Sequence, residues 1–389
     1  MARVWCRYDC VSFVASVVFF DIPLYSNQAT MKKVLVIYRS KLDENRGTPL
    51  RVKNILIRLV RESEINLTVA SWDDRAVISA AHHIHLANNH FDDLKKLYQY
   101  IKNHDIDIVI GHTMATFYYL WPLKLLTSAK IVLEMHGFIE EEARLYGAIS
   151  PFRYRVNKIL YGLFYRNCDL ITTCSDTAAE ELSRYNKNTI SIFGGVDMDV
   201  FYPDVAPKDY FMKEKGKIYI GYAGNTRAWQ GLDFLVDAYR ELREEYPEFM
   251  LVTLTSEAKN APTGDGIVSV GAVPHAEVPH FLAACDILVI PRPANEVNRL
   301  SFPSKLVEYM AMGKPVVGSR TADVHKVITD GVDGMLYDPG DRAGLKRCLI
   351  ALKSVDSRKT LGYNAWQTTR DGYSWDKQVH TFIKELTHL

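Results

Sequence analysis

Cysteine and net charge are both scarce in this sequence, and each scarcity excludes a class of protein. The 389 residues include six cysteines, of which only Cys6 and Cys10 are closely spaced. This usage predicts neither a zinc site nor a disulfide framework and fits a reducing, cytoplasmic compartment. The 47 basic and 46 acidic side chains leave a net charge of +1, which gives no reason to expect nucleic acid as a partner.

Long hydrophobic runs are scarce as well. Residues 11–20 form a mostly apolar run of ten, too short to span a bilayer, and no small-residue cleavage pattern follows it. Residues 1–30 are therefore interpreted either as an extension outside the fold or as a signal-like or membrane-touching arm. We favour the first interpretation, because the segment from Met31 to Tyr38 is how a cytosolic α/β protein usually begins.

The sequence does contain a regular alternation of strand-like and helix-like segments. Hydrophobic residues at 48% and charged residues at 24% are typical of soluble domains, and the length allows two cores. The alternation predicts an α/β fold with doubly wound parallel sheets, and Thr48 and Pro49 predict a helix start. The predicted strands are residues 34–38, 106–110, 131–135, 170–173 and 189–192, then strands near positions 218, 251, 268, 288 and 316.

Two segments of the second half carry the chemistry. Residues 221–231 contain three glycines between a predicted strand and a predicted helix, a turn in which the backbone can approach a phosphate. Residues 302–317 predict a short helix that starts after Pro303, closes at Gly313 and bears the carboxylate Glu308. A sugar nucleotide offers a diphosphate to the first feature and ribose hydroxyls to the second.

The order of these motifs resembles glycosyltransferase family 4, the group 1 glycosyl transferases with the GT-B fold. The resemblance runs from about Met31 to the C-terminus and rests on segments at residues 34–38, 132–136, 171–175, 194–203 and 285–291, besides the two above. It implies two Rossmann-like domains that face a cleft, with residues 31–205 on the acceptor side and residues 206–370 binding the donor. Residues 204–217 are the predicted linker, and residues 371–389 are expected to form a helix that crosses back to the first domain.

The resemblance also implies site residues. His136 and Glu308 are expected to be catalytic, through contacts with the transferred sugar and the ribose. Arg46, Arg51 and His112 are expected on the acceptor side. The implied donor-binding residues are Gly47, Asn225, Arg227, Gln230, Arg292, Ser304, Lys305, Leu306 and Glu308. Without the family context, a histidine at a strand end is better explained by a hydrogen bond to a backbone carbonyl.

The chain departs from the family pattern at three positions. The family's first glutamate, separated by seven residues from the one at Glu308, would fall at Leu300, and Glu296 is a candidate substitute. The usual cations on the diphosphate map to Asn225 and Gln230, which are neutral. Because ion pairs to phosphate are stronger than neutral hydrogen bonds, we expect donor binding to rest on backbone amides, Lys305 and Arg292.

The resemblance implies a retaining transferase that needs no metal or other cofactor. Asp197 to Asp199 has the Asp-x-Asp spacing of a metal-binding motif but lies in a segment that the family uses structurally. The expected function is transfer of a sugar from a nucleotide-diphosphate sugar to an acceptor hydroxyl, in cell-surface glycan or glycolipid synthesis. The alternatives are a non-catalytic GT-B subunit that stabilises a partner enzyme, or a nucleotide-sugar epimerase.

The acceptor is left open between a polysaccharide, a glycolipid and a small molecule. Residues 151–166 interleave cations with aromatic and aliphatic residues, as does a helix that lies on the cytoplasmic face of a membrane. The same pattern is equally well explained by a core helix with a basic outer face. The expected partners are therefore the donor, a glycan or lipid-linked acceptor and, through residues 151–166, a membrane surface.

Overall fold

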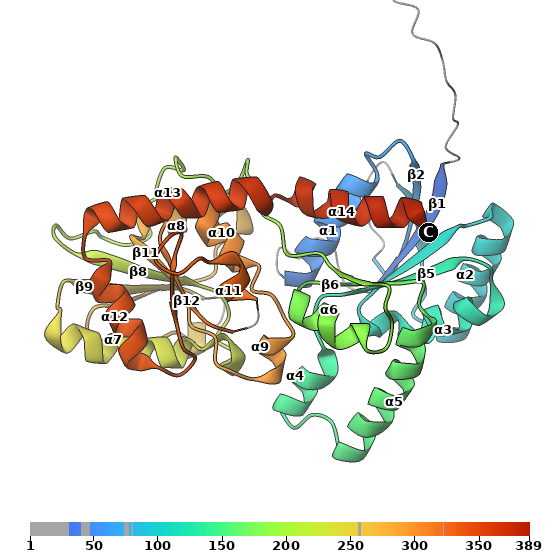
Figure 1. Cartoon of the computed structure of the whole chain (residues 1–389), viewed down its shortest axis with the longest axis horizontal. Coiled ribbons are helices and arrows are strands. Elements are labelled where there is room, and N and C mark those ends of the chain that lie inside the picture. The colour runs from blue at the N-terminus through green and yellow to red at the C-terminus, as the bar shows by residue number, and fades with distance from the viewer. Residues whose placement is uncertain (1–30, 40–46, 74–77, 79–80, 256–257, 322) are drawn as a thin grey trace, which may run out of the picture. The chain divides into compact units, whose positions relative to one another are not determined.

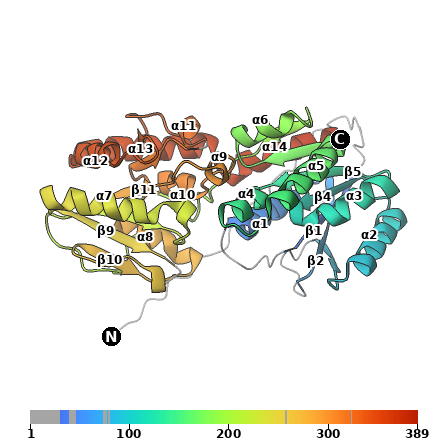
Figure 2. The same cartoon turned by 90° about the horizontal axis from the view of Figure 1, so that it is seen from below.

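The computed structural model contains two parallel sheets, each covered by helices on both faces (Figures 1 and 2). It describes the chain except residues 1–30, 40–46, 74–77, 79–80, 256–257 and 322. The predictions for residues 1–30 and for Arg46 therefore fall outside the described residues. In the part that is described, no helix is long and apolar enough to cross a membrane.

The first sheet has seven parallel strands in the order β3-β2-β1-β4-β5-β6-β7. Alternate residues of β1 enter two different clusters, Val34 and Val36 on one face and Leu35 and Ile37 on the other, so both faces of the sheet are buried. The strands are β1 Lys32–Tyr38, β2 Ile65–Ser71, β3 His82–His85, β4 Ile108–His112, β5 Lys130–Met135, β6 Leu170–Thr173 and β7 Thr189–Ser191.

The second sheet has six parallel strands in the order β10-β9-β8-β11-β12-β13. In both sheets the chain first builds outward to one side and then returns to the other. This order places a crevice at the carboxyl ends of the central strands, where ligands of open α/β folds bind. The strands are β8 Ile218–Ala223, β9 Phe249–Leu254, β10 Ile267–Val270, β11 Ile287–Ile290, β12 Val316–Ser319 and β13 Met335–Tyr337.

The helices follow the strands in alternation. Residues 204–217, the predicted linker, contain neither helix nor strand. Helices of the first half are α1 Gly47–Leu59, α2 His90–His104, α3 Phe117–Leu126, α4 Ile139–Leu145, α5 Pro151–Asn167 and α6 Asp176–Ser183. Those that follow are α7 Leu232–Glu245, α8 Val278–Ala284, α9 Glu296–Arg299, α10 Lys305–Ala311, α11 Val324–Val327, α12 Arg342–Ala351, α13 Val355–Gly372 and α14 Trp375–His388.

The last helix crosses back to the first sheet, as expected. α14 packs beside α1, and its buried residues Trp375, Val379 and Phe382 belong to the same cluster as β1. Just before α14, Ser374 forms an isolated bridge with Val196, which follows β7. The C-terminal segment thus completes the core of the first half (Figure 1).

Most of the predicted strands are present, with shifts of a few residues at their ends. The predicted strand at residues 106–110 is β4 Ile108–His112, so that His112 belongs to the strand. Three strands were not predicted: β2, β3 and β13. Of these, β3 and β13 lie at sheet edges, and β3 reads His-His-Ile-His, whose outer positions are exposed and polar, so no apolar run marks it.

Candidate functional site

Two clusters of polar side chains lie near the carboxyl ends of the central strands, one in each half of the chain. The first surrounds Glu134 on β5 and includes His112 at the end of β4 and His136 just after β5. The second surrounds Lys305 at the start of α10 and the turn that follows β8. Both positions are those that the strand order favours for ligands.

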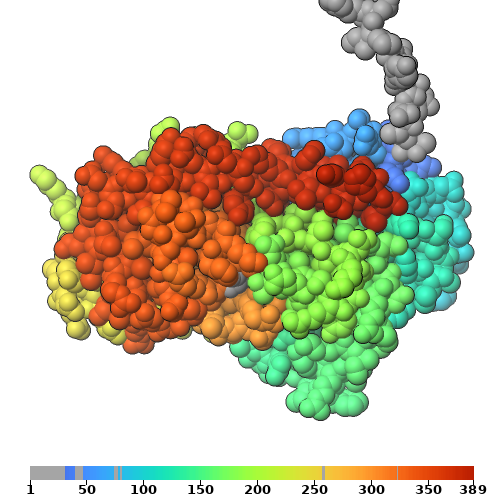
Figure 3. All heavy atoms as spheres, viewed as in Figure 1, coloured from blue at the N-terminus to red at the C-terminus, as the bar shows by residue number. Residues whose placement is uncertain are grey.

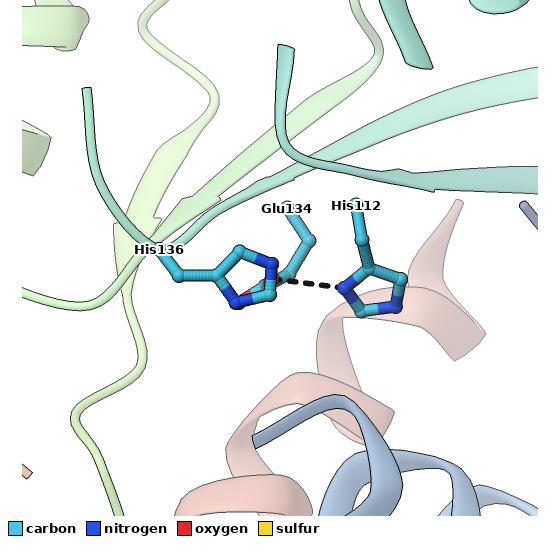
Figure 4. Close-up of side chains that lie close together, drawn as sticks. All are labelled: His112, Glu134 and His136. Carbon is cyan, nitrogen blue, oxygen red and sulfur yellow. Dashed lines mark hydrogen bonds and ion pairs between the residues drawn. The ribbon is translucent and has the colours of Figure 1, made fainter. Parts of the chain in front are cut away.

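Glu134 is the centre of the first cluster (Figure 4). Its carboxylate is 1% exposed. Its Oε2 atom accepts a hydrogen bond from Nδ1 of His112 at 3.0 Å and lies 2.9 Å from Nε2 of His136. The His136 contact has ion-pair distance but not hydrogen-bond geometry, and the two imidazole centroids are 5.3 Å apart. One carboxylate oxygen therefore contacts both histidines.

Arg51 on α1 contacts the other oxygen of Glu134. Its Nε lies 2.8 Å from Oε1, and its two terminal nitrogens donate to the carbonyls of Phe193 at 3.1 Å and Ile192 at 2.8 Å. The side chain is 6% exposed and stacks over the ring of Trp375 at 5.9 Å. The guanidinium is therefore engaged with Glu134 and two backbone carbonyls.

The protonation states in this cluster follow from burial and from Arg51. Burial by itself would raise the pKa of Glu134, but Arg51 and the two histidines together hold that pKa well below its usual range. Burial lowers the pKa of His136 to about 3, although the charge of Glu134 opposes the shift. Glu134 is thus ionised and His136 neutral at physiological pH.

The ligand atoms of His112, Glu134 and His136 lie within 4.8 Å of one another, which is the geometry of a three-ligand metal site. The guanidinium of Arg51 lies 2.8 Å from the same carboxylate and already balances its charge. A divalent cation would add two positive charges to a buried site that is neutral without it, at a large desolvation cost. The donor set therefore fits a hydrogen-bonded cluster better than a metal centre.

Lys305 and Arg292 form the second cluster. Nζ of Lys305 donates to Oε1 of Gln230 at 2.9 Å and lies 4.5 Å from the ring centre of Tyr222. The guanidinium of Arg292, a residue that is 6% exposed, stacks over Trp229 at 5.0 Å and donates to the hydroxyl of Ser301. No described carboxylate forms an ion pair with either cation, and Nε of Arg292 has no hydrogen-bond partner among the described residues.

Burial lowers the affinity of both cations for protons. Burial, assisted by the charge of Arg292, lowers the pKa of Lys305 to about 7, and Glu308 opposes this shift. Burial lowers the pKa of Arg292 to about 10. Two enclosed cations without a described acidic partner make a site for an anion, since an anion would relieve both penalties.

Glycines of the turn after β8 make room for this cluster. A Cβ at Gly224 would lie 2.3 Å from Nζ of Lys305. Gly231 has φ of +77°, and a Cβ there would lie 1.8 Å from the carbonyl oxygen of Pro291. The glycine pattern noticed in the sequence therefore serves a close approach of the lysine and of a neighbouring loop.

Glu308 lies on α10, one turn after Lys305. Its side chain is 15% exposed and lies 3.6 Å from Nε2 of His275, the one ion pair that the described residues give it. Leu306 is fully buried, and Ser304 precedes the helix without capping it through its side chain. The carboxylate of Glu308 therefore has acceptor capacity to spare.

The remaining predicted residues lie in several places. Asn225 accepts from the backbone N–H of Arg227 at 3.2 Å, and Gly47 begins α1 with φ of +37° and open space at its Cβ. Arg227 does not lie free for a phosphate, because it pairs with Glu142 of α4. Leu300 is 4% exposed, while Glu296 pairs with Arg299 at 2.9 Å on the surface.

Three residues of these clusters were not predicted from the sequence as site residues. Glu134 was only part of a motif, although a carboxylate inside an apolar strand needs buried partners and was a usable signal. His275, which contacts Glu308, and Trp229, which stacks on Arg292, left no such signal. Each depends on a contact between residues distant in sequence.

Comparison with known proteins identifies the family. A family model described as glycosyl transferases group 1 matches residues 217–354, and one described as glycosyltransferase family 4 matches residues 72–200. The chain belongs to the family 4 type of GT-B glycosyltransferases. Among solved structures, sucrose-phosphate synthase from Thermosynechococcus elongatus superposes with a TM-score of 0.74 at 16% identity, covering 92% of this chain and 98% of that one.

HepE of Anabaena in complex with UDP-glucose superposes with a TM-score of 0.71 at 17% identity, covering 92% of this chain and 100% of that one. At such identities these structures of other proteins support the GT-B fold alone. By sequence, the chain is 22% identical to an uncharacterized glycosyltransferase of Methanocaldococcus jannaschii over 67% of its length and 68% of that protein. It is 24% identical to N-acetyl-alpha-D-glucosaminyl L-malate synthase of Bacillus anthracis, over 65% and 66%.

The family accounts for the two-sheet architecture, and the comparisons do not favour the alternative of a non-catalytic subunit. Over the first three curated relatives, the matched segment covers 47% to 68% of their length.

Proposed function

We propose that this glycosyltransferase moves a sugar from a nucleotide-diphosphate sugar to an acceptor hydroxyl, with retention of configuration. The observation that supports the donor class is the pair of enclosed cations, Lys305 and Arg292, which no described carboxylate neutralises. A diphosphate supplies the missing negative charge. HepE, which shares the fold, was solved with UDP-glucose, and this agrees with such a donor.

In the proposed reaction, the bond between the anomeric carbon and the diphosphate breaks and the carbon bonds to the acceptor oxygen. The diphosphate leaves with the electron pair, and the acceptor's hydroxyl proton passes to the leaving phosphate. Lys305 and Arg292 stabilise the charge that develops on the leaving group, so we propose that no metal or other cofactor is required. Glu308 accepts hydrogen bonds from the ribose hydroxyls, and His136 contacts the transferred sugar.

A donor panel tests this proposal. The full chain is incubated with UDP-, GDP- and ADP-sugars, with and without membrane lipid extract, while the released nucleoside diphosphate is measured. We expect release from one nucleotide class, stimulated by an acceptor in the extract. Glu308→Ala should lower this rate by about 10- to 100-fold, since each hydrogen bond to a charged group is worth roughly 1.5–3 kcal/mol.

As a matched control, Glu241→Ala removes a carboxylate of the same half that is 42% exposed and paired with Arg342, and it should leave the rate nearly unchanged. Absence of release from every donor would contradict the proposed function. An equal loss in both variants would contradict the assignment of Glu308.

We further propose that the acceptor is lipid-linked and that α5 brings the enzyme to the cytoplasmic face of a membrane, in glycolipid or cell-surface polysaccharide synthesis. α5 contains no acidic residue. Its outer face carries an apolar stripe at helical spacing, Phe152 at 77% exposure, Ile159 at 65% and Leu163 at 43%. The buried face of the same helix holds Tyr161 and Phe164. The stripe is thus additional to the face that fills the core.

Charge on α5 favours an anionic surface. Arg155 and Arg166 flank the stripe on one side and Arg153 on the other, and all three are exposed. Of the acidic residues of neighbouring α4, Glu141 contacts α5 itself, since it accepts from Tyr154 and lies 3.9 Å from Nζ of Lys158, whereas Glu142 pairs with Arg227. Figure 3 shows α5, in the brighter green, at an edge of the molecule.

Vesicle flotation tests the contact. The full chain is floated with vesicles of neutral phosphatidylcholine alone or with about 30% anionic phosphatidylglycerol. We expect binding to the anionic vesicles and loss of at least tenfold in partition for Phe152→Ser with Ile159→Ser, since each exposed apolar side chain contributes roughly 1.5–3 kcal/mol when buried in the interface. Tyr363→Ser on α13, 56% exposed, is the control. Equal binding by all variants would contradict the assignment of α5.

A further inference from the structure

Glu134 has more partners than a buried ion pair needs. Arg51 contacts only Oε1, at 2.8 Å, and would by itself balance the charge. The second oxygen is given to two imidazoles, at 3.0 Å from His112 and 2.9 Å from His136. A carboxylate inside an apolar strand costs free energy, and apolar residues often replace such groups without loss of stability. The arrangement therefore suggests a role beyond stability.

The short contacts to Glu134 favour one ring nitrogen of each histidine as the one that carries a hydrogen. A ring nitrogen with a bare lone pair would be repelled by an ionised oxygen at 2.9–3.0 Å. We therefore place a hydrogen of His112 on Nδ1 and the hydrogen of neutral His136 on Nε2, although the second contact lacks hydrogen-bond geometry. With these tautomers, Nδ1 of His136 and, in the neutral form of His112, its Nε2 carry lone pairs and can only accept hydrogen bonds.

These two acceptors are buried and have no hydrogen-bond partner among the described residues. A buried acceptor without a donor is unfavourable, and a ligand that supplies the donor relieves this penalty. Hydroxyl groups of a sugar are such donors. Arg51 balances the charge of Glu134, and His136 is neutral.

We propose that Glu134 is a positioning residue that fixes His112 and His136 as neutral acceptors for hydroxyl groups of the transferred sugar. The inference rests on the proposed function, and it adds a substrate class, the neutral sugars. A sugar acid would bring a carboxylate close to the lone pairs of the two histidines and to the ionised Glu134. At neutral pH a carboxylate has no hydrogen to donate to these lone pairs, and its charge is repelled by Glu134. Hexuronate donors are therefore disfavoured relative to neutral hexose donors.

The first test reads the tautomers directly and needs no activity. The full chain is labelled with ¹⁵N-histidine, and long-range ¹⁵N–¹H spectra at pH 7 are assigned with His112→Asn and His136→Asn. We expect neutral His112 with hydrogen on Nδ1 and neutral His136 with hydrogen on Nε2. In Glu134→Gln at least one ring should become a mixture of tautomers, since an amide can face either ring with its oxygen or its NH₂ group.

The second test reads turnover. Glu134→Gln should lower kcat by about 10- to 100-fold while KM for the donor changes less than about threefold, as expected when a group acts by orienting another. In the wild-type enzyme, kcat/KM for UDP-glucuronate should be at least tenfold below that of the best neutral UDP-sugar. The control is Asp93→Asn, which alters another buried carboxylate of the same half that binds Ala87 and Trp72 and should preserve the tautomers and kcat.

The outcomes separate the two proposals. Hydrogen on Nδ1 of His136, a charged His136 at pH 7, or unchanged spectra in Glu134→Gln would overturn the positioning role. Equal use of UDP-glucuronate would overturn the substrate class. If Glu134→Gln does not fold, the wild-type spectra still test the predicted tautomers, and the donor comparison still tests the substrate class. The expected tautomers in an enzyme that releases no nucleotide from any donor would instead refute the proposed function.

Discussion

Lys305→Met is expected to weaken binding of UDP-glucose, or of the best donor found, by about 10- to 100-fold at pH 6. The physical reason is the loss of one charge-assisted hydrogen bond to phosphate, worth roughly 1.5–3 kcal/mol. In the wild-type enzyme the ammonium is enclosed beside Arg292 and Gln230, and burial lowers its pKa to about 7. Isothermal titration calorimetry of both proteins measures the change.

The same lysine makes donor binding depend on pH. Below pH 7 the free enzyme already holds the proton, whereas above pH 7 it must take one up to bind the anion. The dissociation constant should therefore rise with pH from about 7, by up to about tenfold per pH unit, and this rise should be absent in Lys305→Met. An intact nucleotide sugar is the appropriate probe, because the terminal phosphate of a free nucleotide titrates near pH 6.

Lys314→Met is the matched control. Lys314 is a lysine of the same half whose pKa burial also lowers, but its Nζ donates to the carbonyl of Ala283 at 3.0 Å and not to the cluster. We expect no change in its donor affinity. Wild-type affinity in Lys305→Met would show that the diphosphate lies elsewhere. A pH dependence that persists without the lysine would assign the titration to another group.

Arg51→Met is expected to lower the free energy of unfolding by about 3–5 kcal/mol at pH 7, because it leaves the buried carboxylate of Glu134 without its guanidinium. The native pKa of Glu134 is held below its unfolded value, so the stabilisation is present above the unfolded pKa and is lost as pH falls through the native one. In the variant that pKa should rise, and the difference from wild type should shrink between pH 7 and pH 5. Urea unfolding followed by circular dichroism checks both statements.

Two further variants test whether the lost stability comes from the buried pair of Arg51 and Glu134. Arg58→Met removes another arginine of α1, one that pairs with Asp376, a residue whose side chain is 76% exposed. It should cost no more than about 1 kcal/mol, as surface pairs do. Arg51→Met combined with Glu134→Gln should recover part of the loss, because the uncompensated charge is then gone. If both arginine variants cost the same, the buried pair is not the reason.

Much of the fold was predictable from local pattern. Apolar runs bounded by turn residues predicted the central strands, since a strand buried on both faces must be apolar along its whole length. β2, β3 and β13 were missed. Two of these are edge strands, which need less burial and so carry less pattern. The helix at Glu308 was predicted correctly because Pro303 and Gly313 mark its two ends.

The sequence by itself determined the alternation of strands and helices, the central strands other than β2, the glycines of the turn after β8, and the resemblance to family 4. Periodicity and turn chemistry are local, so they can be read along the chain. Only the tertiary structure decided the contacts that give the site its chemistry. Lys305 meets Gln230 across 75 positions, and Arg51 meets Glu134 across 83. Such pairs depend on which strand ends become neighbours, and no local pattern specifies that choice.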